Sequence, residues 1–412
     1  MRVLFTTSNW AGHYFCMVPL GWALQAAGHE VRVACTPEQA TTISTAGLVP
    51  VPVLTTPDMM MMARLGCYLD AVEGRRTLPG LPLHPVTGEP VHSLDDFDLA
   101  VEGPRLGAEI ASGISRSFDA AVELARAWRP DLVCYDLTAD EGALVAEVTG
   151  VPGVWVTPGL YGSMEDSTGP DLGPFDTSGS FPRYGLGTWD RSRIRYVLDP
   201  SPDAASPPFG TAVRRTVRYV PYNGPGAYPQ WALHRPDAGR ICVIWGSSAV
   251  GTAAHVPSLR AALDTAVSTG AEVVLTTNPA QVAALGELPP SVRVLHNFPL
   301  HLLLATSDAV IHHGSGNPLM TAAVAGVPQV ALAMNDEQIP VSRRMAGTGA
   351  VIALPGLAAT PDEVRAAVLA VTGDPAYRAA AGNLREELMA RPSPAGLVEP
   401  LEELAAGGSF AP

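Results

Sequence analysis

Short apolar runs alternate with helix-like repeats in the first part of the chain. Residues 3–7 form an apolar run, apolar residues recur at helical spacing between 17 and 27, and Gly28 then marks a helix end before a second run at 31–35. The order strand, helix, strand returns at 131–136, 139–149 and 154–156. A βαβ unit has a right-handed crossover and implies a parallel sheet. We therefore predict a doubly wound α/β architecture.

A second sheet of the same kind is predicted in the other half. Residues 199–237 are dense in Pro and Gly, which favours an extended connection between domains over any helix. Six further apolar runs follow, separated by helical stretches, at 241–245, 272–276, 292–295, 309–312, 329–332 and 350–354. We divide the chain into an N-terminal domain at 1–220, a C-terminal domain at 221–393 and a helical end at 394–412. Packing of that end back on the N-terminal domain stays open.

Residues 55–105 interrupt the alternating pattern. Four consecutive methionines begin at Met59, and a run rich in Pro and Gly follows at 78–85, so this insert is predicted to hold loops with one or two helices. Methionine is flexible and fills irregular apolar spaces. The run is interpreted in two ways, as helix packing or as an adaptable wall, with Met61 and Met62, for a bulky apolar ligand.

Charge and cysteine usage exclude several classes of protein. The chain has 40 acidic residues against 26 Lys and Arg, a net charge of −14, which repels polyanions and argues against nucleic acid as a partner. Its 5 cysteines are scattered, as expected in a reducing cytoplasm. No stretch approaches the roughly 18 apolar residues of a membrane span, and the first residues turn polar too soon for a signal peptide. We expect a cytoplasmic protein with no integral membrane part.

Polar residues after four of the predicted strands carry the candidate chemistry. In open parallel sheets, ligands bind beyond the carboxyl ends of the strands. The polar groups at these ends are residues 9–13, Asp136, residues 246–248 and residues 312–318. Two groups lie in each half, so two sheets whose strand ends face each other would form a cleft for a small molecule.

The group at 312–318 has the composition of an anion-binding turn. Gly314 and Gly316 permit a tight turn, Asn317 is a good N-cap, and Pro318 suits the first helical position. A helix is therefore predicted to begin there and to end at Gly326. The N-terminus of a helix behind a glycine-containing loop is a binding site for phosphate.

The two adjacent histidines of this group are expected to differ. His313 would add a donor beside a phosphate, whereas His312 lies on the opposite side of the strand end. A capped turn with incidental histidines is the alternative, and zinc is disfavoured because neighbouring strand residues cannot easily converge on one metal. The chain lacks both the G-x-G-x-x-G fingerprint after its first strand and the P-loop motif, which disfavours dinucleotide and P-loop nucleotide binding.

His13 and Asp136 are candidates for acid–base chemistry. A neutral imidazole with a pKa of about 6.5 is a competent general base, and a carboxylate can orient and support the imidazolium that forms. The alternatives are a polar residue at a helix start for His13 and a helix cap for Asp136. The sequence alone does not show whether the two residues meet.

Several motifs together resemble one known family. They are RVLF at 2–5 continuing to Gly12-His13, MVPL at 17–20, AAGHEV at 26–31, RYVPYNGP at 218–225, FPLH at 298–301, the block that begins at His312, and GVPQ at 326–329. This set resembles glycosyltransferase family 1, in particular the actinobacterial enzymes that attach deoxysugars to polyketides and related natural products. The resemblance covers essentially the whole chain.

The resemblance implies a GT-B fold, in which two Rossmann-like domains face each other across a cleft. The N-terminal half would hold the acceptor and the C-terminal half the nucleotide sugar, with His13 as general base and Asp136 as its partner. The implied donor-binding residues are Gly12, Ser247, Phe298 beside the base of the nucleotide, His313, Gly314, Ser315, Gly316, Asn317 and the sugar-binding pair Glu337-Gln338.

The phosphate loop departs from the family pattern. A Gly-Gly-Ala-Gly-Thr segment is common there, where this chain has residues 314–318 as Gly-Ser-Gly-Asn-Pro. Asn317 brings a side chain to a position where glycine lets the phosphate approach the backbone, and Pro318 removes a hydroxyl and an N–H. Ser315 or the Asn317 amide could replace the lost donor.

The resemblance leads to a specific interpretation. We expect an inverting glycosyltransferase that moves a deoxysugar from a nucleoside diphosphate, thymidine-linked, to an apolar aglycone in antibiotic-type biosynthesis, with no metal and no other cofactor. Its partners would be the nucleotide sugar and the aglycone, and a homodimer stays open. Two alternatives remain: a non-catalytic relative that binds a partner or a sugar nucleotide, and a sugar-nucleotide epimerase of GT-B fold.

Overall fold

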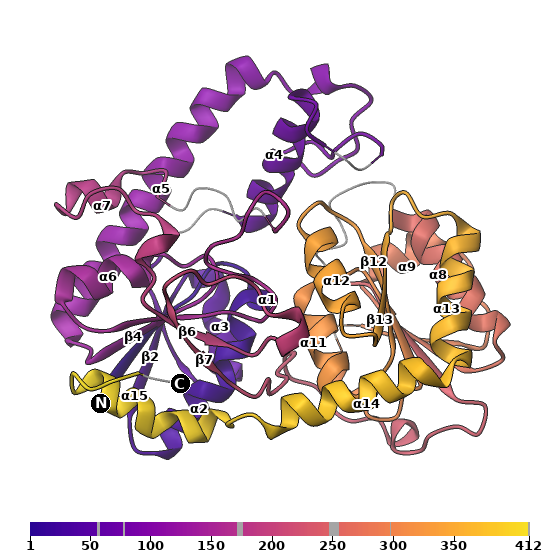
Figure 1. Ribbon diagram of the computed structural model, residues 1–412. Helices are drawn as coiled ribbons and strands as arrows, with labels where there is room; N and C mark the ends of the chain where they lie inside the picture. The colour runs from indigo at the N-terminus through magenta and orange to yellow at the C-terminus, as the bar shows by residue number, and fades with distance from the viewer. Residues whose placement is uncertain (56–57, 77–78, 171–175, 247–254, 297, 411–412) are drawn as a thin grey trace.

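Two α/β domains, each built on a parallel sheet, make up the protein (Figure 1). The computed structural model describes residues 1–55, 58–76, 79–170, 176–246, 255–296 and 298–410. Within these ranges, the first sheet has seven strands in the order β3-β2-β1-β4-β5-β6-β7, and the second has six in the order β10-β9-β8-β11-β12-β13. All pairings between these strands are parallel. The predicted doubly wound fold class is confirmed.

The elements have the following bounds. The strands are β1 (Arg2–Thr6), β2 (Glu30–Cys35), β3 (Val49–Pro52), β4 (Leu132–Tyr135), β5 (Gly153–Val156), β6 (Tyr196–Asp199), β7 (Val213–Thr216), β8 (Arg240–Ile244), β9 (Glu272–Thr276), β10 (Val292–Leu295), β11 (Ala309–His312), β12 (Gln329–Ala333) and β13 (Val351–Pro355). The helices are α1 (Ala11–Tyr14), α2 (Val18–Ala26), α3 (Ala40–Thr45), α4 (Met59–Val72), α5 (Leu99–Trp128), α6 (Glu141–Thr149), α7 (Ser180–Arg183), α8 (His255–Ser268), α9 (Pro279–Leu285), α10 (Leu300–Leu304), α11 (Gly316–Ala325), α12 (Gln338–Ala346), α13 (Pro361–Gly373), α14 (Pro375–Ala390) and α15 (Val398–Ala405).

The prediction of an extended connection at 199–237 is wrong for the first part of that range. Asp199 closes β6, and residues 213–216 form β7, the edge strand of the first sheet. The strand β7 has the sequence VRRT and is half-buried throughout, as an edge strand can be because one side is open to water. The strand β3 at the opposite edge was not predicted for a similar reason. Its sequence VPVP contains two prolines, which an edge strand tolerates.

The insert at 55–105 holds one complete helix and the start of another, as predicted. The side chain of Asp58 caps α4 by accepting from the backbone N–H of Met60 and Met61, and α5 runs on for 30 residues to Trp128. A small apolar cluster centred on Tyr68 joins the two helices. Figure 1 shows α4 and the upper part of α5 projecting beyond the first sheet on the side of the domain boundary.

The C-terminal end returns to the first domain, which answers the question left open by its sequence. α14 crosses below both domains (Figure 1), and Leu397, Leu401 and Phe410 join the same core cluster as residues of β1 and β2. The chain thus passes between the domains twice, once after β7 and once after α14. These two connections lie side by side, because the backbone N–H of Arg218 donates to the carbonyl of Pro392 at 2.8 Å. No helix in the described part of the chain is long and apolar enough to span a membrane.

Candidate active site between the two sheets

The candidate site lies where both sheets reverse their strand order. β1 and β4 are neighbours at the centre of the first sheet, as β8 and β11 are in the second, and such a switch point leaves a crevice at the carboxyl ends of the strands. His13 follows β1 and Asp136 follows β4, while His313 follows β11. The two switch points face each other, because Asn317 Nδ2 of α11 donates to the carbonyl of Gly12 at 3.1 Å.

His13 is held at one ring nitrogen only. Its Nδ1 lies 3.1 Å from Thr138 Oγ1 and 3.3 Å from Ser8 Oγ. The ring is half-buried, and the loss of hydration lowers the pKa of His13 to about 4, so the imidazole is neutral at pH 7. Among the described residues, none bonds to Nε2. The ring therefore presents Nε2 as a nitrogen that can take up a proton.

Asp136 does not bond to His13 directly, a point that the sequence left open. The carboxylate is fully buried, and Oδ2 accepts from the backbone N–H of Ser8 at 2.7 Å and from Ser8 Oγ at 2.8 Å. Oδ1 accepts from the backbone N–H of Thr138 at 3.0 Å. Burial raises the pKa of Asp136 to about 6, although these bonds act in the opposite direction.

The Ser8 hydroxyl links the two groups. Because its single hydrogen is donated to Asp136, Ser8 Oγ can only accept from His13, which places the imidazole hydrogen on Nδ1 and the lone pair on Nε2. Sequence reasoning missed both Ser8 and Thr138. The available signal was their position, since each is a hydroxyl residue within a few positions of a strand end that faces the site.

Three acidic residues are buried together after β4. Besides Asp136, they are Asp140 and Glu141, 3 % and 1 % exposed, and burial raises the pKa of each of these two to about 7. Glu141 accepts a hydrogen bond from Ser117 Oγ at 2.8 Å. At a pH where these buried carboxyl groups ionise, the loss of hydration of their charges lowers the free energy of unfolding.

Removal of the Glu141 charge should therefore stabilise the protein at alkaline pH. The pKa of Glu141 in the folded protein lies above the unfolded value of about 4.3. The protonated Glu141 side chain therefore contributes its full stabilisation below pH 4, and this contribution is lost as the pH rises through 7. We expect Glu141→Gln to raise the free energy of unfolding by on the order of 2 kcal/mol at pH 8 and to change it little at pH 4.5. Thermal unfolding at both pH values measures this, with the exposed Glu123→Gln as the control. An equal effect at both values would contradict it.

The two histidines after β11 point to different places. His312 is fully buried, accepts from the backbone N–H of Gly314 at Nδ1 and donates from Nε2 to Gln329 Oε1 at 3.0 Å. His313 lies toward the end of β8, with Nδ1 3.3 Å from the carbonyl of Ile244 and Nε2 2.8 Å from Ser315 Oγ. Burial lowers the pKa of His313 to about 4. His312 therefore braces the loop, while His313 borders the crevice.

The helix after this loop begins earlier than its sequence predicted. The N-cap of α11 is Ser315 with extended backbone, and Asn317 is its second residue. Gly326 ends the helix with a φ of 71°, as predicted. Gly314 has a φ of +83°, and a Cβ there would lie 2.8 Å from Ser342 Oγ, so glycine is required at this position.

The other donor residues implied by the resemblance belong to the second domain. Ser247 lies outside the described residues. Phe298 packs against a core cluster of the second domain, as Trp231 and Leu300 also do. Gln338 is buried at the first position of α12, and its Oε1 accepts from the backbone N–H of Met334 at 2.8 Å, while the neighbouring Glu337 is exposed.

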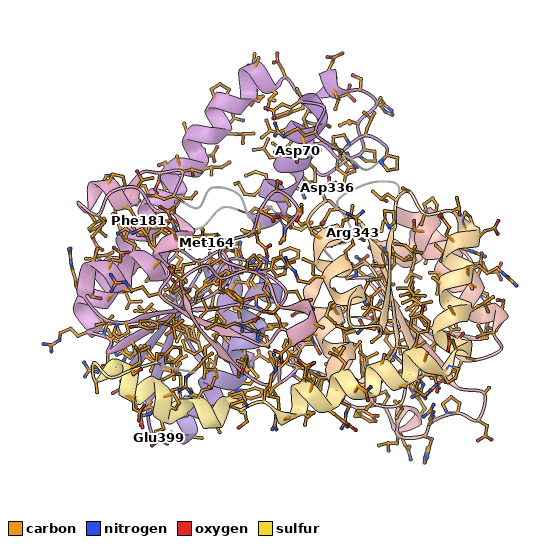
Figure 2. The ribbon with its side chains drawn as sticks, in the orientation of Figure 1. Asp70, Met164, Phe181, Asp336, Arg343 and Glu399 are labelled. Atoms are coloured by element: carbon orange, nitrogen blue, oxygen red, sulfur yellow. The ribbon has the colours of Figure 1, made fainter. Side chains whose placement is uncertain are left out.

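The insert reaches toward this end of α12. Asp70 of α4 and Asp336, which lies just before α12, lie close to each other in the view of Figure 2. Burial raises the pKa of Cys67 on α4 to about 11. The charge of Arg76 acts in the opposite direction, and the charges of Glu337, Asp336 and Asp70 add to the increase. The helix that carries the methionine run thus lies close to the residues implied in sugar binding.

The two methionines proposed for an acceptor wall are not equivalent. Met61 packs against the cluster of Tyr68, Phe97 and Leu106 within the insert, which supports the packing interpretation at that position. Met62 is half-buried and belongs to none of the apolar clusters of the described residues. Met62 therefore keeps the ligand interpretation, which stays a prediction.

Among the described residues, no group of three or more His, Cys, Asp or Glu side chains is arranged to hold a metal ion.

An ion pair connects the two domains, since Arg344 Nη2 of α12 lies 2.8 Å from Glu165 Oε2. Both side chains are largely buried, at 17 % and 9 % exposure.

The chain is similar to known proteins over nearly its whole length. Models of the erythromycin biosynthesis protein CIII-like N-terminal and C-terminal domains match residues 22–72 with 107–246, and residues 260–404. The chain is 33 % identical to 3-alpha-mycarosylerythronolide B desosaminyl transferase of Saccharopolyspora erythraea, over 99 % of both chains. It is 34 % identical to 10-deoxymethynolide desosaminyltransferase of Streptomyces venezuelae, over 98 % of this chain and 97 % of that protein.

Solved structures give the same result. Spinosyn rhamnosyltransferase SpnG, complexed with thymidine diphosphate, is 30 % identical with a TM-score of 0.73, over 98 % of this chain and 100 % of that one. The glycosyltransferase SnogD of Streptomyces nogalater is 29 % identical with a TM-score of 0.70, over 98 % and 99 %. These neighbours share the GT-B arrangement of two parallel-sheet domains. The chain therefore belongs to the erythromycin biosynthesis protein CIII-like family and is a glycosyltransferase of GT-B fold.

Proposed function

We propose that this glycosyltransferase moves a deoxysugar from thymidine diphosphate to a hydroxyl of an apolar natural-product aglycone, with inversion at the anomeric carbon. The observation that carries the proposal is the pair of facing switch points, with the His13–Ser8–Asp136 chain on one side and His313 with the first turn of α11 on the other. Relatives named as desosaminyl transferases and a neighbour solved with thymidine diphosphate support this choice of substrates.

The base chemistry follows from the hydrogen bonds of His13. Nε2 takes the proton from the acceptor hydroxyl while the acceptor oxygen attacks the anomeric carbon. Nδ1–H donates to Ser8 Oγ, which donates to Asp136 Oδ2. The negative charge of Asp136 stabilises the imidazolium through this hydroxyl, and burial strengthens the interaction because little water screens it.

Departure of the leaving group is the task of the second domain. The bond between the anomeric carbon and the diphosphate oxygen breaks on the face opposite the attacking oxygen, which inverts the configuration. The diphosphate would lie at the N-terminus of α11, where the N–H groups of Gly316 and Asn317 belong to the unpaired first turn. Pro318 has no N–H to offer, and Leu319 N–H donates to the carbonyl of Ser315. His313 supplies a further donor through Nε2–H, in the tautomer whose Nδ1 accepts from the backbone N–H of Gly246. We propose that these groups stabilise the charge of the departing diphosphate by hydrogen bonding, without a metal.

Incubation with substrates tests the proposal. We expect mass spectrometry to detect a glycosylated product only when a thymidine-diphosphate deoxysugar and a macrolide or polycyclic aglycone are both present, and NMR to show the inverted anomeric configuration. A donor that changes into another sugar nucleotide without acceptor would instead indicate an epimerase. A donor that is bound and stays intact with every acceptor would favour the non-catalytic alternative.

A further inference from the structure

The side chain of Asn317 leaves its own domain: one end of its amide contacts the other domain, and the other end contacts the segment that connects the two sheets. Nδ2 donates to the carbonyl of Gly12 at 3.1 Å, and Oδ1 accepts from the hydroxyl of Tyr219 at 3.2 Å. Gly12 immediately precedes His13 in α1. Tyr219 lies in the chain crossing between the sheets, after β7 and before β8.

The surroundings fit this contact closely. A Cβ on Gly12 would lie 2.8 Å from Trp10 Nε1, which is too close, and 3.4 Å from Asn317 Nδ2, which is an ordinary contact. Trp10 therefore favours glycine at this position, and the amide of Asn317 packs closely beside it. Tyr219 is 3 % exposed, and burial raises the pKa of its hydroxyl, which therefore stays protonated and can donate. Each polar atom of the Asn317 amide thus has a partner of the correct kind.

This arrangement differs from the role that the sequence suggested. A side-chain amide bound at both ends does not face a phosphate, so Asn317 does not replace the lost donor with its side chain. Its backbone N–H still lies in the first turn of α11, where the diphosphate is proposed to bind. One residue therefore belongs to the phosphate-binding turn and holds the turn of the general base.

We propose that Asn317 is a positioning residue that clasps the phosphate-binding end of α11 to the His13 turn. This inference rests on the proposed function. Transfer requires the acceptor oxygen, held by His13, to lie in line with the bond to the diphosphate, held by α11. Small errors in such geometry lower rates strongly. The clasp sets the distance between the two domains at the reacting centre, whereas nucleotide binding within the second domain does not depend on it.

Two variants and their combination test the clasp. We expect Asn317→Ala to lower kcat by about tenfold and to change the dissociation constant for thymidine diphosphate by less than about threefold. Tyr219→Phe should lower kcat by about threefold alone and should add nothing in the Asn317→Ala background, because both changes remove one connected contact. The control is Asp203→Ala, which removes the bond from Arg391 Nη2 at 2.9 Å at the α14 crossing and should leave kcat unchanged.

Hydrogen exchange gives a readout that needs no turnover. The segment around residues 10–17 should exchange faster in Asn317→Ala than in the wild type or in Asp203→Ala, because the Gly12 carbonyl loses its partner. Unchanged kcat and unchanged exchange in Asn317→Ala would overturn the clasp. So would a tenfold loss of thymidine diphosphate affinity, which would place the amide on the phosphate.

Failure of the clasp and failure of the proposed function can be told apart. If the wild type transfers no sugar at all, the proposed function is wrong, and hydrogen exchange alone then decides on the clasp. If Asn317→Ala does not fold, Tyr219→Phe keeps its buried ring and decides in its place. A wild-type kcat in that folded variant would contradict the inference. Where both variants fold, additive effects of the two changes on kcat would contradict it as well.

Discussion

Replacement of His13 by alanine is expected to lower kcat by about two orders of magnitude or more, since general base catalysis contributes about 10²–10⁴-fold. The nucleotide sugar is proposed to bind to the other domain, so the dissociation constant for thymidine diphosphate should stay nearly unchanged. Steady-state kinetics with a hydroxyl acceptor, combined with calorimetry, measures both. His234→Ala, an exposed histidine at the start of the second domain, is the matched control.

The pH profile adds a second test of the same residue. Because burial lowers the pKa of His13 to about 4, the base stays unprotonated well below the pH at which an ordinary histidine becomes charged. The acid limb of kcat/KM should therefore lie below pH 6.5, and it should disappear in His13→Ala. Asp136→Asn and Ser8→Ala should each reduce kcat, since the carboxylate acts through the serine hydroxyl. Near-normal turnover of a hydroxyl acceptor by His13→Ala would contradict the assignment, and normal turnover by Ser8→Ala would remove the link.

Substitution of His313 should weaken nucleotide binding far more than substitution of its neighbour. A hydrogen bond to a charged phosphate contributes about 1.5–3 kcal/mol, so His313→Ala is expected to raise the dissociation constant for thymidine diphosphate by about 10–100-fold. His312→Ala instead removes the bonds to Gln329 and to the Gly314 backbone. Its main effect should be a lower melting temperature.

Titration calorimetry at a temperature where both variants are folded separates these outcomes. Thermal unfolding with and without nucleotide provides the complementary measurement, because a ligand that binds the folded state raises the melting temperature in proportion to its affinity. Equal losses of affinity in the two variants would show that the loop acts as a unit. A larger loss in His312→Ala would reverse the assignment.

The central strands could be predicted from sequence because they are apolar on both faces. The six strands of the second sheet lie within one or two residues of their predicted bounds. β3, β6 and β7 were missed because two of them are edge strands, and all three lie in or beside stretches with prolines or charged residues. Alternation and burial, which make a strand visible in a sequence, are weak at a sheet edge.

The candidate site shows the same division. His13, Asp136 and His313 follow the strand ends at which the sequence placed them, since the carboxyl edge of a parallel sheet is a property of topology. Their roles stay predictions. The Ser8 link could not be derived, because it depends on which hydroxyl lies between two strand ends. The N-cap was predicted at Asn317 from local preference, yet a contact with Gly12 in the other domain determines that side chain. Contacts across a domain boundary leave no local pattern.

The return of the chain to its first domain bears on how the protein is made. β7 ends at Thr216, whereas the residues that complete the core beneath β1 and β2 begin at Leu397. As the chain leaves the ribosome, part of the apolar core on this face of the first sheet therefore stays exposed while the whole second sheet is synthesised. The second domain can finish folding first, against the usual N-terminal-first order of synthesis. Closure of the first core by α15 then becomes the last step, and it joins the two domains in the same event.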